Sequence, residues 1–246
     1  MGAALLWGAL AASSLLVGAL LGVARTWPGR LVGLVLAFGA GALIASVSFE
    51  LAEEGLQTGG PVPVAIGIAL GALAFAGGNA GIQALGARRH RGETHKDGET
   101  HKDEGGTGLA FGAFLDGIPE QAVLGIGLAS GGPVSVALLV AVWISNLPES
   151  IGSASDMRRD GTARRSILLL WVGVTTVCAL ATVGGYALAD VSGDTGAAVI
   201  NGFAAGALLV MLVDEMIPEA RSKAGAAAGL ATAVGFALAA GLSKLT

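Results

Sequence analysis

The chain has 246 residues, of which 53% are hydrophobic and only 13% are charged, with a formal net charge of −4 and a mean hydropathy of +0.73. This composition is too apolar and too poor in charge for an ordinary soluble domain, and we expect no nucleic-acid partner. The single cysteine, Cys178, excludes a disulfide framework or a thiolate metal site within one chain. Because Cys178 lies inside an apolar run, we interpret it as a small packing residue.

Apolar runs of membrane-spanning length follow one another along the chain. A helix needs about 20 predominantly apolar residues to cross the hydrocarbon core. Eight runs meet this requirement, at about 3–23, 31–52, 62–86, 107–130, 134–156, 166–188, 195–219 and 224–243. No Lys or Arg precedes the first run, so it lacks the basic region of a secretory signal and is expected to span. The sequence therefore predicts an all-α polytopic protein of the cell (inner or cytoplasmic) membrane, with a single membrane domain and the lipid bilayer as a partner.

The loops between these runs alternate in charge. Basic residues follow the first, third, fifth and seventh runs: Arg25, Arg30, Arg88, Arg89, Arg91, Lys96, Lys102, Arg158, Arg159, Arg164, Arg165, Arg221 and Lys223. The loops after the second, fourth and sixth runs contain no Lys or Arg. Because basic loops stay in the cytoplasm, this alternation predicts eight spans with both termini outside.

One stretch, residues 88–106, is long and polar. It contains a tandem repeat of Gly-Glu-Thr-His-Lys-Asp and all three histidines of the chain, His90, His95 and His101. We predict a flexible cytoplasmic loop, because the stretch is too polar to bury a core. Its histidines and carboxylates favour weak metal binding by this loop. The alternative is a solvated linker whose repeat arose by duplication.

One short pattern occurs twice, near the middle of the fourth and fifth runs. The first copy reads Asp-Gly-Ile-Pro-Glu over residues 116–120, and the second reads Ser-Asn-Leu-Pro-Glu over residues 145–149. The first and last residues of each copy are four apart, so they lie on one helix face. Because the two helices are antiparallel and joined by a very short turn, we expect both copies at the same depth in the bilayer.

Three carboxylates of this pattern, Asp116, Glu120 and Glu149, would together cost on the order of 8–10 kcal/mol at the bilayer centre on insertion scales. No Lys, Arg or His is predicted at that depth, so a bound divalent cation or protonation must neutralise them. Pro119 and Pro148 cannot donate a backbone hydrogen bond and are expected to kink their helices, which frees a carbonyl beside each glutamate. The pattern therefore predicts a metal site.

Two other runs end in acidic residues. Glu50 lies toward the outer end of the second run, and the cytoplasmic end of the seventh run carries Asp214, Glu215 and Glu219. These residues are candidates for the two mouths of an ion pathway, and the alternative is that they are solvated helix ends at the membrane interface.

At these residues the chain resembles the ZIP (Zrt-, Irt-like) family of divalent-metal transporters, in particular its bacterial and archaeal GufA-like branch. The resemblance covers the whole chain: eight helices, both termini outside, a variable His-bearing loop between helices 3 and 4, paired Pro-Glu motifs on helices 4 and 5, and the acidic run 213–219 on helix 7. It implies a 3+2+3 arrangement, in which helices 1–3 and 6–8 form an inverted repeat around helices 4 and 5. It also implies that the protein is not an enzyme and moves metal into the cytoplasm by alternating access.

Matched residue by residue, the resemblance implies a main metal site of Asp116, Glu120 and Glu149, with Ser145 as a weak ligand. A second site would keep Asn146 and share the two glutamates. Family members usually carry histidine ligands in these motifs, so the implied site of this chain is all-oxygen. Oxygen ligands tolerate Mn²⁺, whereas the intrinsic order of affinity still favours Zn²⁺. We therefore expect a divalent metal as substrate rather than cofactor, zinc first, with cadmium, manganese and iron competing.

Two other functions stay open. A non-transporting metal sensor or scaffold of the same fold is compatible with the altered ligands. An intramembrane enzyme that uses Asp116 with Glu120 or Glu149 as an acid/base pair is the other alternative, although the chain has no nucleophilic Ser-His pair and no HExxH motif. The family often forms dimers, so a homodimer is a further expectation, although no single helix marks an interface.

Overall fold

The computed structural model describes residues 1–91, 106–129, 136–190 and 193–243. Within these ranges, the side chains at positions 82–91, 106–116, 119, 137 and 190 lie outside the description. The described chain is helical and contains no strand, which confirms the all-α prediction for this part of the protein.

Eight continuous helical runs make up the described chain. They are α1 (Gly2–Ala24); α2 (Gly29–Ser46) with η1 (Val47–Ala52) and α3 (Glu53–Gly59); α4 (Pro61–Arg91); α5 (Gly106–Ala129); α6 (Val136–Arg159); α7 (Arg164–Asp190); α8 (Gly193–Met211) with η2 (Leu212–Met216) and α9 (Ile217–Ala224); and α10 (Ala227–Leu242). Each run overlaps one of the predicted apolar runs. Helix α4 continues beyond its predicted end at residue 86, because Ala and Arg favour a helix even where the sequence is no longer apolar.

Five of these runs are long and apolar enough to cross a membrane: Gly2–Ala24, Gly29–Gly59, Pro61–Gly81, Arg164–Ala189 and Gly193–Ala224. Shorter apolar helices among the described residues are Glu120–Ala129 and Ala227–Leu242. Helix α6 has 24 residues, but serines, an asparagine and acidic residues interrupt its apolar sequence. The chain is therefore a helical protein with the character of a multi-pass membrane protein.

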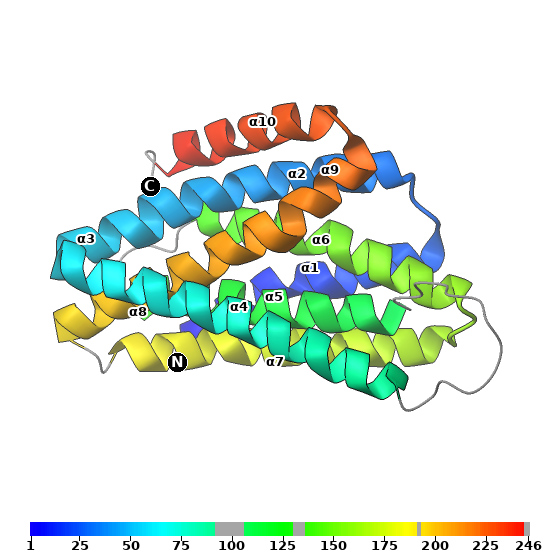
Figure 1. The fold of residues 1–246 in the computed structure, drawn as a ribbon, viewed down its shortest axis with the longest axis horizontal. Coiled ribbons are helices and arrows are strands. Elements are labelled where there is room, and N and C mark those ends of the chain that lie inside the picture. Colours follow the sequence, from blue (N-terminus) through cyan, green and yellow to red (C-terminus); the bar gives the residue numbers. More distant parts are fainter. Residues whose placement is uncertain (92–105, 130–135, 191–192, 244–246) are drawn as a thin grey trace.

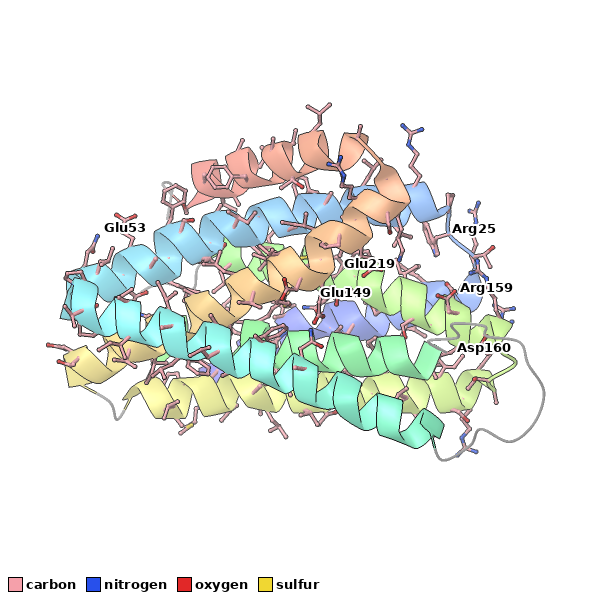
Figure 2. The ribbon with its side chains drawn as sticks, viewed as in Figure 1. Arg25, Glu53, Glu149, Arg159, Asp160 and Glu219 are labelled. Atoms are coloured by element: carbon pink, nitrogen blue, oxygen red, sulfur yellow. The ribbon has the colours of Figure 1, made fainter. Side chains whose placement is uncertain are left out.

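The helices lie roughly along one axis, so the bundle has two distinct ends (Figure 1). The start of α1, the short helix α3 and the end of α10 lie toward one end, and the connections from α1 to α2 and from α6 to α7 lie at the other. Figure 2 shows Glu53 at the first end and Arg25, Arg159 and Asp160 at the second. The labelled arginines are thus separated from Glu53 along the bundle axis, which is the arrangement that alternating loop charge predicts.

Glycines bring several pairs of helices into close backbone contact. At several glycines, a Cβ atom would meet the backbone of a neighbouring helix. They include Gly67, Gly71, Gly202 and Gly206 between α4 and α8; Gly41 and Gly235 between α2 and α10; Gly125 and Gly185 between α5 and α7; and Gly18 and Gly22 of α1, which face α6. In the first three pairs the contact is reciprocal, because each helix contributes glycine. Close approach of this kind supplies the van der Waals contact that holds helices together in lipid.

Two helical runs leave α-helical geometry where they carry acidic residues. The π-helical turn η1 contains Glu50, and the π-helical turn η2 contains Asp214 and Glu215. Helices α5 and α6 are continuous through Pro119 and Pro148, and the kinks expected at these residues stay a prediction. Turns of π-helix within α-helices are frequent at functional sites, and the sequence pattern carried no signal for them.

Candidate functional site

Helix α5 carries a glutamate, Glu120, that is only 1% exposed. Its carboxylate lies within hydrogen-bond distance of two donors on α6. Ser145 Oγ is 3.1 Å from Oε1, and Asn146 Nδ2 donates to Oε2 at 2.6 Å. The donors are consecutive residues, so one turn of α6 holds both oxygen atoms of the carboxylate. The last residue of the first five-residue pattern thus meets the first two residues of the second.

The hydrogen bonds of Asn146 decide the orientation of its amide group. Nδ2 donates to Glu120 Oε2 and also to the carbonyl oxygen of Val142, at 2.9 Å. A carbonyl oxygen and an ionised carboxylate only accept hydrogen bonds, so the amide nitrogen belongs on this side. Oδ1 is left on the other side, where it is buried and accepts no hydrogen bond from the described residues.

Small residues of α1 and α2 cover this turn of α6. The Cβ position of Gly39 on α2 lies 2.9 Å from the Cα atom of Ser145. The Cβ position of Gly18 on α1 lies 2.6 Å from the carbonyl oxygen of Leu147 and also meets Ser150 Oγ. Neither glycine has room for a side chain, so the backbones of three helices approach closely here. This close packing keeps Ser145 buried beside Glu120.

Glu149 lies one helical turn beyond Ser145 and Asn146 on the same face of α6. Glu149 is half-buried, and Figure 2 shows it between the two ends of the bundle. On the following turn, Lys223 Nζ lies 3.6 Å from the Cβ position of Gly152. Lys223 was predicted in a loop, whereas it belongs to α9 and its ammonium group reaches to within about one turn of Glu149.

Helix α7 adds polar contacts to the same part of α5. Thr182 Oγ1 donates a hydrogen bond to Gln121 Oε1 at 2.8 Å, and both residues are fully buried. Cys178 is one turn before Thr182, and its Sγ atom lies 2.8 Å from the Cβ position of Gly117 on α5. Sequence reasoning missed Gln121 and Thr182 as partners and interpreted Cys178 as a packing residue. The available signal was the presence of polar residues inside apolar runs, which does not say which helices meet.

Two of the predicted pathway residues take part in polar contacts near η2. Glu215 accepts a hydrogen bond from Asn79 Nδ2 of α4 at 2.6 Å. Glu219 forms an ion pair with Lys223 of the same helix, at an Nζ–Oε1 distance of 2.5 Å. Figure 2 shows Glu219 on the side of the bundle, toward the end that carries the labelled arginines.

The other two pathway candidates differ in exposure. Asp214 is exposed on η2, whereas Glu50 is half-buried on η1. The side-chain hydrogen bonds described for Glu120 are those with Ser145 and Asn146 of α6.

Four predicted ligands lie outside the described side chains: Asp116, His90, His95 and His101. Among the side chains that are described, no three His, Cys, Asp or Glu residues are gathered closely enough to hold a metal ion. The described part of the predicted site is therefore Glu120 with the two polar residues of α6, and Glu149 one turn away. A cation between α5 and α6 would take oxygen ligands from both helices.

No protein-family model and no curated protein matches this chain. The functional interpretation therefore depends on the residues of the site, above all on a buried carboxylate and the groups that hold it.

Proposed function

We propose that this protein is a divalent-metal transporter of the ZIP type, which carries zinc, in competition with cadmium, manganese and iron, into the cytoplasm. The observation that carries the proposal is the burial of Glu120 in an apolar helix bundle, with Ser145 and Asn146 holding its carboxylate. An ionised carboxylate is unstable in such surroundings unless a proton or a cation neutralises it. A carboxylate kept at such a cost within a membrane helix is expected to serve function.

The distribution of ligands over two helices favours transport over permanent metal binding. Glu120 belongs to α5, whereas Ser145, Asn146 and Glu149 belong to α6. An ion held between two helices is released when one helix moves relative to the other, and many transporters place their substrate between moving elements in this way. The predicted ligand Asp116, on the same face of α5 as Glu120, would complete a three-carboxylate site.

The proposed architecture has eight membrane spans, in which α1 to α4 and α7 to α10 form two inverted halves around α5 and α6. The glycine contacts support two related halves, because α2 meets α10 and α8 meets α4 through reciprocal glycines. Each half also contains one π-helical turn with acidic residues, η1 or η2. Glycine contacts also join α5 to α7 and α6 to α1, so each central helix packs against one helix of a different half.

The proposed orientation puts the end with Arg25 and Arg159 in the cytoplasm and both termini outside. Figure 2 shows Glu149 between that end and the end with Glu53. An ion would enter from the side of Glu53, bind at Glu120 and Glu149, and leave toward the arginines. The movement of α5 against α6 would open the site first to one side and then to the other.

Uptake of radioactive zinc and manganese into proteoliposomes tests this proposal. The variants are Glu120→Gln and Glu149→Gln, because glutamine keeps the size of the side chain and removes its charge. Both variants are expected to lose uptake of both ions. Glu54→Gln is the matched control, because Glu54 is a glutamate of α3, at the end of the bundle, and its loss should leave uptake unchanged.

The outcomes separate the proposed function from its alternatives. If the double variant Glu120→Gln, Glu149→Gln took up the ions at the rate of the wild-type protein, transport through this site would be refuted. Zinc binding by the folded wild-type protein without any uptake would identify a metal sensor or scaffold instead.

A further inference from the structure

The fold places the one thiol of this chain beside the proposed site. Cys178 lies near the middle of α7 and is fully buried. Its Sγ atom is 2.8 Å from the position that a Cβ atom on Gly117 would occupy. Gly117 is one turn before Glu120 on the same face of α5. The lack of a side chain at position 117 therefore makes room for the thiol against α5, next to the turn that carries Glu120.

A second buried group faces the same spot. Asn146 Oδ1 lies 3.8 Å from the Cβ position of Gly117, Asn146 is 1% exposed, and Oδ1 accepts no hydrogen bond from the described residues. Burying an acceptor without a donor carries a free-energy cost. The amide cannot turn to avoid this cost, because Nδ2 is engaged by Glu120 and by the carbonyl of Val142. Oδ1 is thus oriented for a ligand that approaches between α5, α6 and α7.

The thiol and the amide oxygen both lie beside the part of α5 that carries Glu120. The same amide that presents Oδ1 toward Gly117 donates from Nδ2 to Glu120. Sulfur, amide oxygen and carboxylate oxygen therefore come from three different helices to one region.

The register of α7 against α5 is held one turn beyond the thiol. Thr182 donates to Gln121 at 2.8 Å, and Gly125 and Gly185 bring the two backbones into contact. Rotation or sliding of α7 would break these contacts, so the position of Cys178 relative to Gly117 is determined by the packing of the helices.

From these contacts we infer that Cys178 is a specificity-determining ligand, whose sulfur joins Asn146 Oδ1 and Glu120 in holding the transported ion. This inference rests on the proposed transport function and replaces the all-oxygen site that the sequence predicted. When the ion binds, a sulfur–metal bond replaces the S–H bond and the proton is released to water, with no change in oxidation state. A sulfur ligand favours Zn²⁺ and Cd²⁺, whereas Mn²⁺ prefers oxygen ligands.

Cadmium binding to the purified full-length protein tests the inference without a transport assay. A cadmium–thiolate bond absorbs in the ultraviolet, and the chain has one cysteine, so this absorption reports on Cys178 alone. We expect the absorption in the wild-type protein and not in Cys178→Ser. The preference for Cd²⁺ over Mn²⁺ in competition should fall by at least about tenfold in Cys178→Ser, since the loss of even an outer-shell partner has an effect of that size.

Two further variants test whether cadmium binding requires the thiol at position 178, and not merely a thiol somewhere on α7. The double variant Cys178→Ala, Leu180→Cys moves the thiol to a residue of the same helix that is 54% exposed. It should show no cadmium–thiolate absorption, although it still carries one thiol on α7. Gly117→Ala keeps the cysteine but places a methyl group where the sulfur lies, and it should also lose the absorption.

The wild-type protein decides the outcome even if Cys178→Ser fails to fold. Cadmium binding that depends on Glu120 but produces no cadmium–thiolate absorption would overturn the role of Cys178 and leave the transport proposal intact. A folded wild-type protein that binds none of the ions would overturn the transport proposal, and the role of Cys178 with it.

Discussion

Replacing Gly185 with alanine tests the contact that holds α5 against α7. A Cβ atom at position 185 would meet the carbonyl oxygen of Ala122 and lie 2.9 Å from its carbonyl carbon and 3.0 Å from its Cα atom. Optimal contact between carbon atoms is about 3.5–4.0 Å, so the two helices would have to separate by about 0.5–1 Å. The atoms of Ala122 in the way belong to the backbone, so they cannot move to another rotamer as the end of a side chain can.

The free energy of unfolding should change in opposite directions at two adjacent positions. Overpacking at Gly185 costs about 1–3 kcal/mol, and alanine in a helix interior returns about 0.5–1 kcal/mol relative to glycine. Because the obstacle is backbone, we expect a cost of about 2–3 kcal/mol, in the upper half of the overpacking range, and a net destabilisation by Gly185→Ala of about 1–2.5 kcal/mol. Gly184 has nothing within 4 Å of its Cβ position, so Gly184→Ala should stabilise the protein by about 0.5–1 kcal/mol.

Thermal unfolding in detergent, followed by tryptophan fluorescence, compares both variants with the wild type. Gly185→Ala should unfold at a lower temperature and Gly184→Ala at a higher one. Zinc uptake should fall only in Gly185→Ala, because α5 carries Glu120 and is the helix displaced. If Gly185→Ala were as stable as the wild type, the close approach of α5 and α7 would be refuted, and with it the placement of Cys178.

Two further substitutions test polar contacts outside the central site. Asn79→Ala should cost about 1–3 kcal/mol, because it removes a 2.6 Å hydrogen bond to the carboxylate of Glu215. Asn79→Asp should cost more, because two carboxylates would then face each other, and thermal unfolding that does not distinguish Asn79→Ala from the wild type would contradict the contact. Lys223→Ala removes the ion pair with Glu219, whose partners are 31% and 36% exposed, so the same measurement should show a loss below about 1 kcal/mol. A larger loss of stability would mean that Lys223 has a second stabilising partner. Because Lys223 Nζ approaches Gly152, that partner would be expected on α6.

In the proposed transport mechanism, the hydrogen bonds at Glu120 would couple ion binding to helix movement. Ser145 and Asn146 occupy positions on both carboxylate oxygens, so an incoming ion has to replace part of these contacts. Both donors are on α6, whereas Glu120 is on α5. Exchanging these hydrogen bonds for metal ligands therefore changes the forces between the two helices, which is the event that alternating access requires.

Length and hydropathy were sufficient to locate the helices of this chain. In lipid, every backbone polar group has to be satisfied within its own helix, so a long apolar run has one available conformation. The meeting of Glu120 with Ser145 and Asn146 was also accessible from the sequence. A short connection makes α5 and α6 antiparallel neighbours, and each pattern lies near the middle of its helix.

The tertiary structure decided which helix faces meet and where the helices depart from α-helical geometry. Gln121 and Thr182 are 61 positions apart, and Asn79 and Glu215 are 136 positions apart, so no local pattern could pair them. Most of these helices are apolar on all sides, and an apolar stripe therefore does not indicate which face is buried. The rotation of each helix depends instead on where a glycine lets a neighbouring backbone approach. At Gly117 the missing side chain leaves room for the thiol of Cys178, a residue that the sequence analysis interpreted as a packing residue, at the edge of the proposed site.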